Sequence, residues 1–389
     1  MLAENSLHPW TNDFIRAIHG APGKLVLCLT GGGSGAISSL LETPGASRTV
    51  LEAAVPYAAE ALIRWLHARP EQFCSEATAR TMAMTAYLRA REYQRSDPSS
   101  PLAGIGCTCS LASDRPKHGA HRIHAALQTE NRTVAYSVDL VKGERTREAE
   151  ETVAASLVLN FVAEFKNRTE RLDCGLLPNE KLRVVRSIAP LDWQRLLNGS
   201  QRLAGSGTSA VEAEEADLSG RVIFAGAFHP RHDGHRAMAK IAAERTGRTV
   251  EHELSIVNVD KPPIDFIEME RRAAQFAADE PLWFTRAPTF IEKTAIFPKA
   301  TFVVGADTIL RIAEAKYYGG EAARDEALAS LTAAGCRFLV FGRCHEVGFQ
   351  TLGDLHLPEA LRRLCNEVPA DAFRLDVSST LLRQASAEP

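Results

Sequence analysis

Two histidines lie three residues apart in the segment His232-Asp233-Gly234-His235, which follows a short apolar run and a turn containing glycine and proline. Apolar residues recur at helical spacing after this segment. The sequence therefore predicts a strand, a tight loop and a helix that begins at the histidines. Unpaired backbone N–H groups and the helix dipole favour an anion at such a helix start. The two imidazoles could also donate hydrogen bonds to phosphate there. These residue types suit a nucleoside triphosphate, although a single segment of this kind also arises by chance in strand–helix turns.

A second set of phosphate-binding residue types lies near the C-terminal end of the sequence. Ser378, Ser379 and Thr380 are types that begin helices and leave hydroxyls and N–H groups for oxygen atoms. Arg383 follows three or four residues later, so it shares a helix face with them, and its guanidinium can bind phosphate with two donors. The two sets together predict one triphosphate site. The alternative is a C-terminal helix with an ordinary serine cap and a solvated arginine.

The two motifs together resemble the HIGH-type nucleotidyltransferase superfamily, and within it most of all the nicotinamide or nicotinate mononucleotide adenylyltransferases. The stretch GAFHPRH at 226–232 is similar to the GxFxPxH of that family, except that His229 stands where the family usually has Asn or Asp. The stretch FVVGAD at 302–307 resembles a strand of the family that ends in GAD. The resemblance covers most of residues 219–389 and is specific to the superfamily rather than to the acceptor substrate.

This resemblance implies a transferase that moves AMP from ATP to nicotinamide or nicotinate mononucleotide and releases pyrophosphate, a step of NAD biosynthesis. The attacking phosphate is already an anion, so the enzyme must hold two anions together and stabilise spreading charge. Mg²⁺ would accompany the ATP, and no metal ligand is assigned to the chain. The resemblance implies catalytic roles for His232, His235 and Arg383. Nucleotide contacts fall on Gly226, Ala227, Phe228, Gly234, Lys261, Asp307, Ser378, Ser379 and Thr380.

Several of these assignments have ordinary structural alternatives. Gly226 and Gly234 would let the backbone approach a ligand closely. Lys261 could instead be a solvated loop lysine, and Asp307 could cap the helix that follows it. Arg343 could reach the site or lie at the surface. The whole domain could also be a HIGH-type transferase that uses CTP or a pantetheine-phosphate acceptor, or a nucleotide-binding regulator without catalysis.

The N-terminal half contains a glycine-rich segment, 30–35, between an apolar strand and a helix. It lacks the ending of a P-loop, so a tight turn competes with a phosphate-binding loop as its interpretation. Together with PGAS at 44–47, SEATARTMA at 75–83 and GIG at 104–106, it resembles the CinA C-terminal domain, a nicotinamide mononucleotide deamidase fold, over residues 10–167. Within the second of these segments, Ser75 is expected to cap a helix. By alignment from PGAS, Thr30 replaces the nucleophilic serine of that family and Leu62 replaces its lysine. We therefore expect a catalytically degenerate domain that binds a ligand or acts as a scaffold.

The 389 residues and a hydrophobic content of 45% allow two domains with real cores. We expect a first α/β domain over 1–194, a flexible linker over 195–218 because of its Gly/Ser/Ala/Glu-rich composition, and a nucleotidyltransferase domain over 219–389. Strands and helices alternate in the last domain, which predicts a Rossmann-like, doubly wound parallel sheet with its ligands at the carboxyl ends of the strands. The expected strands are 222–224, 251–257, 282–285, 301–304 and 337–341. The expected helices after the first are 266–277, 290–297, 308–315, 322–334 and 378–384.

The composition and net charge of the sequence limit the classes of binding partner that we expect. A net charge of −3 argues against nucleic acid or a membrane surface as the main partner, and no apolar run reaches the roughly 20 residues of a membrane span. The N-terminus has neither a signal-type apolar core nor an acid-poor start, and the eight cysteines fit free thiols in a reducing compartment. We expect a cytoplasmic protein, with the nucleus left open. Its partners would be ATP and a mononucleotide, and a homo-oligomer is left open.

Overall fold

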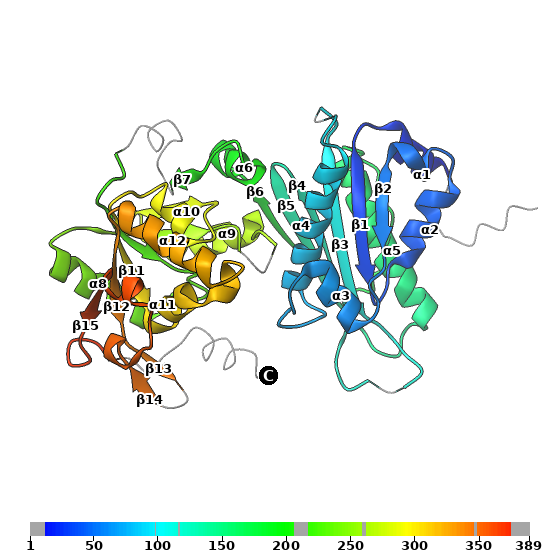
Figure 1. Cartoon of the computed structure of the whole chain (residues 1–389). Coiled ribbons are helices and arrows are strands. Elements are labelled where there is room, and N and C mark those ends of the chain that lie inside the picture. The colour runs from blue at the N-terminus through cyan, green and yellow to red at the C-terminus, as the bar shows by residue number, and fades with distance from the viewer. Residues whose placement is uncertain are drawn as a thin grey trace, which may run out of the picture. The chain divides into compact units, whose positions relative to one another are not determined.

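The computed structural model describes residues 12–97, 99–115, 117–205, 217–258, 262–345 and 348–374. By their contacts, residues 1–194 and 260–268 group into one compact unit, and residues 195–259 and 269–389 into another. Each unit is built on its own sheet, as Figure 1 shows, which confirms two α/β domains. Several predicted site residues lie outside the described part of the chain: Lys261, Ser378, Ser379, Thr380 and Arg383.

The first unit has a six-stranded sheet of order β2-β1-β3-β4-β5-β6. The strands near its β2 edge are parallel, and the others pair antiparallel. The strand bounds are β1 (Lys24–Thr30), β2 (Val50–Ala54), β3 (Leu102–Ser110), β4 (His121–Thr129), β5 (Arg132–Leu140) and β6 (Arg183–Ile188). The helix bounds are α1 (Asn12–Gly20), α2 (Ser34–Glu42), η1 (Ala46–Arg48), α3 (Ala59–Leu66), α4 (Glu76–Tyr93) and α5 (Arg147–Phe165).

Helices α4 and α5 cover opposite faces of this sheet (Figure 1). Helix α4 lies directly on β3 because Gly104 and Gly106 have no side chain, and a Cβ at Gly104 would be only 2.1 Å from the carbonyl oxygen of Ala83. The alternate residues of β3 point into the α5 side of the core. Ser75 caps α4 as expected, because its hydroxyl accepts the Thr78 N–H at 3.2 Å.

The second unit has a seven-stranded sheet of order β15-β12-β11-β8-β9-β10-β7. All of its pairs are parallel except the one between β7 and β10. Along the chain, β8 to β10 extend the sheet to one side, and β11, β12 and β15 extend it to the other. This is the doubly wound order that the sequence predicted, with its reversal between β8 and β11. The strand bounds are β7 (Leu203–Gly205), β8 (Val222–Ala225), β9 (Val250–Ser255), β10 (Leu282–Thr285), β11 (Thr301–Gly305), β12 (Arg337–Phe341) and β15 (Cys365–Val368).

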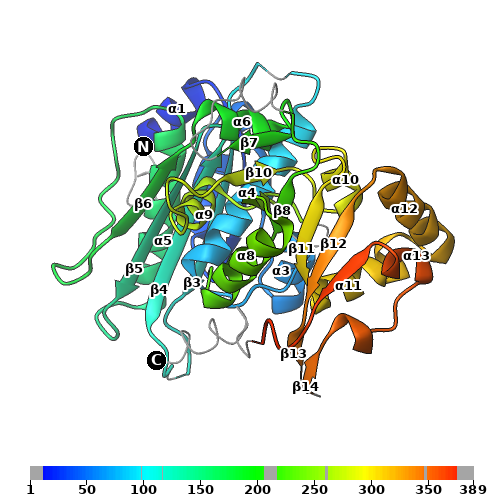
Figure 2. The same ribbon diagram turned by 90° about the vertical axis from the view of Figure 1, so that its left-hand side faces the viewer.

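Helices cover both faces of the second sheet. Figure 2 shows β8, β11 and β12 side by side, with α8 on one side of them and α11 and α12 on the other. The helix bounds are α8 (Asp233–Thr246), α9 (Phe266–Ala273), α10 (Phe290–Thr294), α11 (Ala306–Ala313), η2 (Ala315–Tyr317), α12 (Glu321–Ala333), η3 (Leu352–Asp354) and α13 (Glu359–Arg362). A hairpin of β13 (Arg343–His345) and β14 (Gly348–Gln350) follows β12.

Three helix predictions differ from the structure at their ends. Helix α9 stops at Ala273 and α10 at Thr294, whereas we expected 277 and 297. In both places the apolar residues that suggested more helix belong to turns that pack on the sheet, such as Phe297, which is fully buried. Helix α11 begins two residues earlier than expected because it starts directly at the end of β11.

The predicted linker is partly regular structure. Helix α6 (Leu191–Asn198) runs into it, and residues 203–205 form β7, which pairs antiparallel with residues 283–285 of β10. A three-residue strand is too short to show an alternating pattern, and its backbone hydrogen bonds to a distant strand do not depend on composition. A flexible linker over the whole of 195–218 is therefore wrong for the described part of that range.

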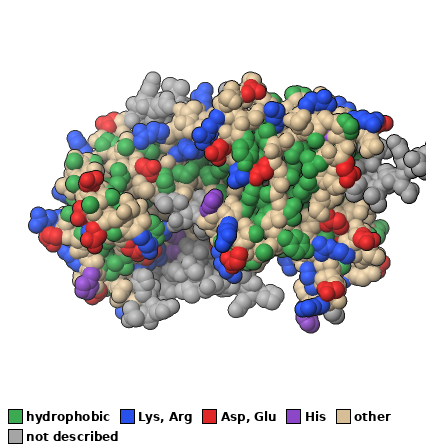
Figure 3. Space-filling view, turned by 45° about the vertical axis from the view of Figure 1, so that its right-hand side comes forward, with side chains coloured by type: hydrophobic (Ala, Val, Ile, Leu, Met, Phe, Trp, Pro, Cys, Tyr) green, Lys and Arg blue, Asp and Glu red, His purple; other side chains and the backbone are tan. Residues whose placement is uncertain are grey.

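The surface carries mixed charge. On the face shown in Figure 3, lysine and arginine side chains are interspersed with aspartate and glutamate. Among the described residues, no helix is both long enough and apolar enough to cross a membrane.

Candidate functional site

The connection from β8 to α8 carries both predicted histidines to the place where the strand order reverses. His232 is the N-cap of α8, and His235 lies in its first turn. Their ring centroids are 3.8 Å apart, with the rings tilted by 33°. Both side chains are largely buried, at 7% and 6% exposure. In doubly wound sheets this reversal leaves a crevice at the carboxyl ends of the strands, where ligands bind.

His235 is held as one neutral tautomer. Its Nδ1 accepts a hydrogen bond from the backbone N–H of His232 at 3.2 Å, so the proton of the neutral ring is on Nε2. Burial, together with the neighbouring His232 and Arg343, lowers the pKa of His235 to about 3. The ring is therefore uncharged at neutral pH and presents Nε2–H as a donor.

His232 has unused hydrogen-bonding capacity. Both of its ring nitrogens are buried, and neither has a partner in the part of the chain that the structure describes. Burial and the charge of Arg343 lower its pKa, so this ring is also neutral. Buried polar groups in folded proteins are nearly always hydrogen-bonded, and an exception of this kind fits a group that meets a ligand.

The glycines of the loop make room for side chains of the same loop. A Cβ on Gly234 would lie 2.8 Å from Cε1 of His232, and a Cβ on Gly226 would lie 2.9 Å from the ring of Phe228. We expected these glycines to allow close approach of a ligand. The atoms that need the space in this structure are those of His232 and Phe228.

Phe228 is a core residue. Its side chain is 1% exposed and meets the rings of Phe224, His235 and Phe276 edge-on, at centroid distances of 5.4, 5.3 and 5.3 Å. The side chain of Phe228 faces the protein interior. The predicted nucleotide contact would therefore have to be made by the backbone of this residue. Ala227 is exposed, and its carbonyl oxygen accepts a hydrogen bond from Nη1 of Arg272 at 3.0 Å.

Asp307 and Arg343 lie at the ends of the next two strands. Asp307 is in the first turn of α11, and the N-cap of that helix is Gly305. Its Oδ1 is 3.4 Å from Nε of Arg343, which follows β12. The charge of Arg343 acts on both histidines. The structure thus places the guanidinium of Arg343 near the two imidazoles and Asp307. The sequence had left open whether Arg343 reaches this site or lies at the surface.

Four polar residues behind this loop were not predicted from the sequence. Arg231 and His252 are buried, and Gln275 and Glu280 are half-buried. His252 lies in β9 between the rings of Phe224 and Phe276, and burial lowers its pKa to about 4. No local motif marks this set, because the hydrogen bonds that join Arg231 to Gln275 and Glu280 span 44 and 49 residues of sequence.

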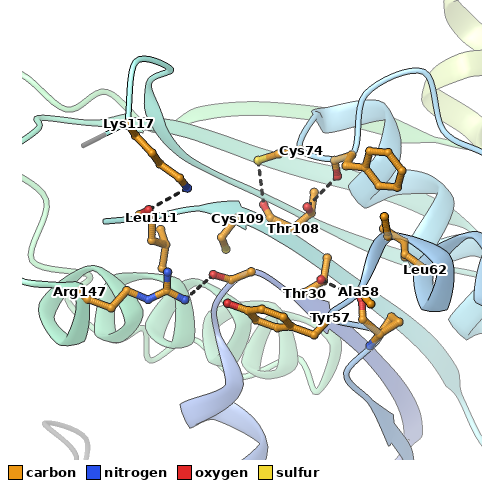
Figure 4. A pocket seen from close by; sticks show the side chains of 14 residues that line it. Thr30, Tyr57, Ala58, Leu62, Cys74, Thr108, Cys109, Leu111, Lys117 and Arg147 are labelled. Atoms are coloured by element: carbon orange, nitrogen blue, oxygen red, sulfur yellow. Dashed lines mark hydrogen bonds between the residues drawn. The ribbon is translucent and has the colours of Figure 1, made fainter. Parts of the chain in front are cut away.

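The first unit contains a cavity of about 260 Å³ where β1 and β3 end. Figure 4 shows Lys117 and Arg147 on one side of it and Thr30, Ala58 and Leu62 on the other. The two positions at which the family resemblance places a nucleophile and a lysine therefore line one cavity. However, the Thr30 hydroxyl donates to the carbonyl oxygen of Pro56 at 3.0 Å, and Leu62 is 2% exposed within the core. None of the described residues that line this cavity is a carboxylate or a histidine that could act as a base.

The glycine-rich loop of the first unit already holds an anion of its own chain. The carboxylate of Glu151, from α5, accepts hydrogen bonds from Gly33 N at 2.8 Å, Ser34 Oγ at 2.9 Å and Gly35 N at 3.2 Å. These donors are the start of α2, where a phosphate would otherwise bind. The loop is therefore a tight turn closed by an internal carboxylate rather than an open phosphate-binding loop.

No protein-family model matches the chain, and no curated protein sequence matches it. Several solved structures are similar to part of it. Competence/damage inducible protein CihA from Agrobacterium tumefaciens is 17% identical, with 41% of this chain and 98% of that chain covered and a TM-score of 0.32. A CinA superfamily protein from Escherichia coli is 12% identical, with coverages of 38% and 83% and a TM-score of 0.30. The competence damage-inducible protein A from Klebsiella pneumoniae is 14% identical, with coverages of 40% and 94% and a TM-score of 0.29.

Each match covers about two fifths of this chain, at low identity and low TM-score. The matches therefore carry no conclusion about the ligand or the reaction. Among the described residues there is also no group of three or more His, Cys, Asp or Glu side chains placed to hold a metal ion.

Proposed function

We propose that the second unit is a nucleotidyltransferase that transfers AMP from ATP to nicotinamide or nicotinate mononucleotide and releases pyrophosphate. One observation carries the proposal. Two neutral imidazoles, with ring centroids 3.8 Å apart, lie at the N-terminus of α8, where the order of the parallel strands reverses. That position combines the positive end of a helix dipole with the two ring nitrogens of His232, which have no hydrogen-bond partner among the described residues.

Each group has a role in this proposal. The N–H groups of α8 and Nε2–H of His235 would donate to the phosphates. His232, whose neutral ring carries a single N–H, would donate from that one nitrogen. Arg343 would offset part of the triphosphate charge, a task that suits a guanidinium. Mg²⁺, bound mainly through the phosphate oxygens and water, supplies further charge neutralisation when ATP is present. Lys261, Ser378, Ser379, Thr380 and Arg383 remain part of the proposal as phosphate contacts.

The reaction needs positioning more than proton transfer. An oxygen of the acceptor phosphate attacks the α-phosphorus of ATP, the bond to the β-phosphate oxygen breaks, and pyrophosphate leaves with that electron pair. The attacking oxygen is already ionised at neutral pH, so no general base is required. Neutral histidines fit such a site because they donate hydrogen bonds where negative charge grows in the transition state.

Isotope exchange tests the proposal. The full chain would be incubated with Mg²⁺, labelled pyrophosphate, ATP or CTP, and one acceptor at a time. We expect label to enter ATP only when nicotinamide or nicotinate mononucleotide is present. Exchange into CTP, or with a pantetheine phosphate, would assign a different transferase. Absence of exchange with every pair, combined with calorimetric binding of ATP, would make the unit a nucleotide-binding regulator.

A further inference from the structure

The residue directly before His232 is a buried arginine whose two terminal nitrogens are both hydrogen-bonded, whereas its Nε has no hydrogen-bond partner among the described residues. The side chain of Arg231 is 3% exposed. Its Nη1 donates to Oε2 of Glu280 at 2.7 Å, and its Nη2 donates to the other carboxylate oxygen of Glu280. Nη1 also donates to the carbonyl oxygen of Gln275 at 3.1 Å, and the guanidinium lies 4.3 Å from the ring centroid of Phe276. Bidentate pairing of this kind fixes both position and orientation.

Gln275 connects the two ends of the same loop. Its Oε1 accepts the backbone N–H of Arg231 at 2.7 Å, and its Nε2 donates to the carbonyl oxygen of Phe228 at 3.0 Å. One side-chain amide therefore spans residues 228–231 and uses both of its polar ends. A carboxylate could not replace it, because a carboxylate has no donor for the Phe228 carbonyl.

Glu280 is itself held in place. Its Oε2 accepts the backbone N–H of Ala277 at 2.9 Å, within the turn that follows α9. The hydrogen bonds from Arg231 lower the pKa of Glu280 to about 2, so the carboxylate stays charged at any pH of interest. Arg231 thus has a permanent counter-charge in a buried place, where loss of that charge would leave an uncompensated cation.

The loop that these residues hold determines the hydrogen bond to His235. Arg231 is followed directly by His232, whose backbone N–H points to Nδ1 of His235. The ring of Phe276 packs against Phe228, and Phe228 packs against the ring of His235. Backbone and aromatic contacts therefore both run from the 275–280 turn to the imidazole that we place against the phosphates.

We propose that Arg231, Gln275 and Glu280 form a positioning cluster that keeps the His232 N–H directed at Nδ1 of His235, so that His235 presents Nε2–H to the ligand. None of the three touches the ligand in this arrangement. They act through the backbone of 228–232. The role of the cluster in catalysis rests on the proposed transferase function, whereas its effect on the imidazole does not.

The test measures the tautomer of His235 directly. Full-length chain labelled with ¹⁵N-histidine would be studied by long-range ¹H–¹⁵N spectra, with the His235 signal assigned from its absence in His235→Gln. The variants are Gln275→Leu, which removes the bridge at similar size, and Glu280→Gln, which keeps the shape but removes the charge. Lys240→Ala is the matched control, because Lys240 lies on α8 with its side chain 78% exposed.

We expect His235 to be the Nε2–H tautomer in the parent chain and in Lys240→Ala, and to become a mixture in Gln275→Leu and Glu280→Gln. In a chain with transferase activity, the same two variants should lose at least tenfold in kcat, with a smaller change in KM. An unchanged tautomer in a folded Gln275→Leu or Glu280→Gln variant would overturn the proposal. If one of the two variants fails to fold, the other decides. A shifted tautomer in a chain without any transferase activity would support the cluster and refute the proposed function.

Discussion

At the scale of single residues, His235 is defined by its two ring nitrogens, which have separate tasks. Nδ1 accepts the backbone N–H of His232, and Nε2 is left as a donor. We expect His235→Asn to keep an acceptor near the Nδ1 position and to lose the Nε2 donor. Turnover should then fall by about a hundredfold, the effect of losing one donor to developing charge.

The side chain of His235 is only 6% exposed, so His235→Ala also removes packing and should lose both turnover and some stability. Steady-state kinetics and chemical unfolding of both variants, beside Lys240→Ala, measure the two effects separately. Near-normal turnover in His235→Asn would contradict the assignment of Nε2–H as a phosphate donor.

The buried histidines also predict a pH dependence of stability. Burial lowers the pKa of His235 to about 3 and that of His252 to about 4, against 6.5 for an ordinary histidine. Between these values the unfolded chain binds more protons than the folded one, so the free energy of unfolding falls as the pH drops below 6.5. Each group contributes a slope of up to about 1.4 kcal/mol per pH unit.

Urea unfolding at pH 7, 6 and 5, followed by circular dichroism, measures this slope. His252→Gln should flatten it, because the substituted side chain binds no proton in either state. Equal slopes for the parent chain and the variant would show that His252 titrates normally in the folded protein. Glu280 does not interfere in this range, since its pKa is lowered to about 2 and its contribution is lost only below pH 4.5.

At the scale of the element, α8 has a glycine at each end with a different physical role. Gly234, in the first turn, leaves room for the His232 ring, which a Cβ would approach to 2.8 Å. Gly247, the C-cap, has φ 64° and no neighbour that a Cβ would meet. The first glycine is required by packing at the site, and the second by backbone conformation.

We therefore expect opposite results from two similar substitutions. In Gly234→Ala the His232 ring must rotate away, so turnover should drop at least tenfold while the fold is retained, helped by the helix preference of alanine. In Gly247→Ala stability should fall by about 1 kcal/mol, with turnover unchanged. Kinetics and unfolding curves of both variants test this. A Gly234→Ala variant with normal turnover would mean that His232 has no role at the site.

At the scale of the whole molecule, the first unit keeps a cavity lined by Thr30 and Leu62, the residues that stand where the resembled family has its nucleophile and its lysine. Thr30 donates its hydroxyl to a backbone carbonyl, Leu62 is part of the core, and Glu151 occupies the N–H groups at the start of α2. A hydroxyl nucleophile needs an adjacent base, and those N–H groups are not open to an oxyanion.

We predict that the full chain releases no measurable ammonia from nicotinamide mononucleotide in a coupled enzymatic assay. Glu151→Ala, which opens the start of α2, should not restore release because the Thr30 hydroxyl stays hydrogen-bonded to the carbonyl oxygen of Pro56. Steady ammonia release by the parent chain would show that Thr30 or another residue of this cavity is an active nucleophile.

The amino-acid sequence by itself determined the features that depend on neighbours along the chain. The serine cap of α4, the start of α8 at the two histidines and the alternation of strands and helices were all predicted from local patterns, and the structure confirms them. Helix caps and apolar periodicity depend on residues that are only a few positions apart in the sequence. They can therefore be recognised without knowledge of the fold. The doubly wound, mainly parallel character of the second sheet was also predicted, because a chain of alternating strands and helices has few ways to form a parallel sheet.

Only the tertiary structure decided which distant groups complete each site. Arg231 meets Glu280 across 49 residues, and Glu151 reaches the loop at Gly33 across 118. Phe228 turned inward rather than toward a nucleotide, and residues 203–205 joined the edge of a sheet. A buried charge or an unpaired helix start must be satisfied, but the sequence does not say by which residue, because the choice depends on the packing of elements that are far apart in the chain.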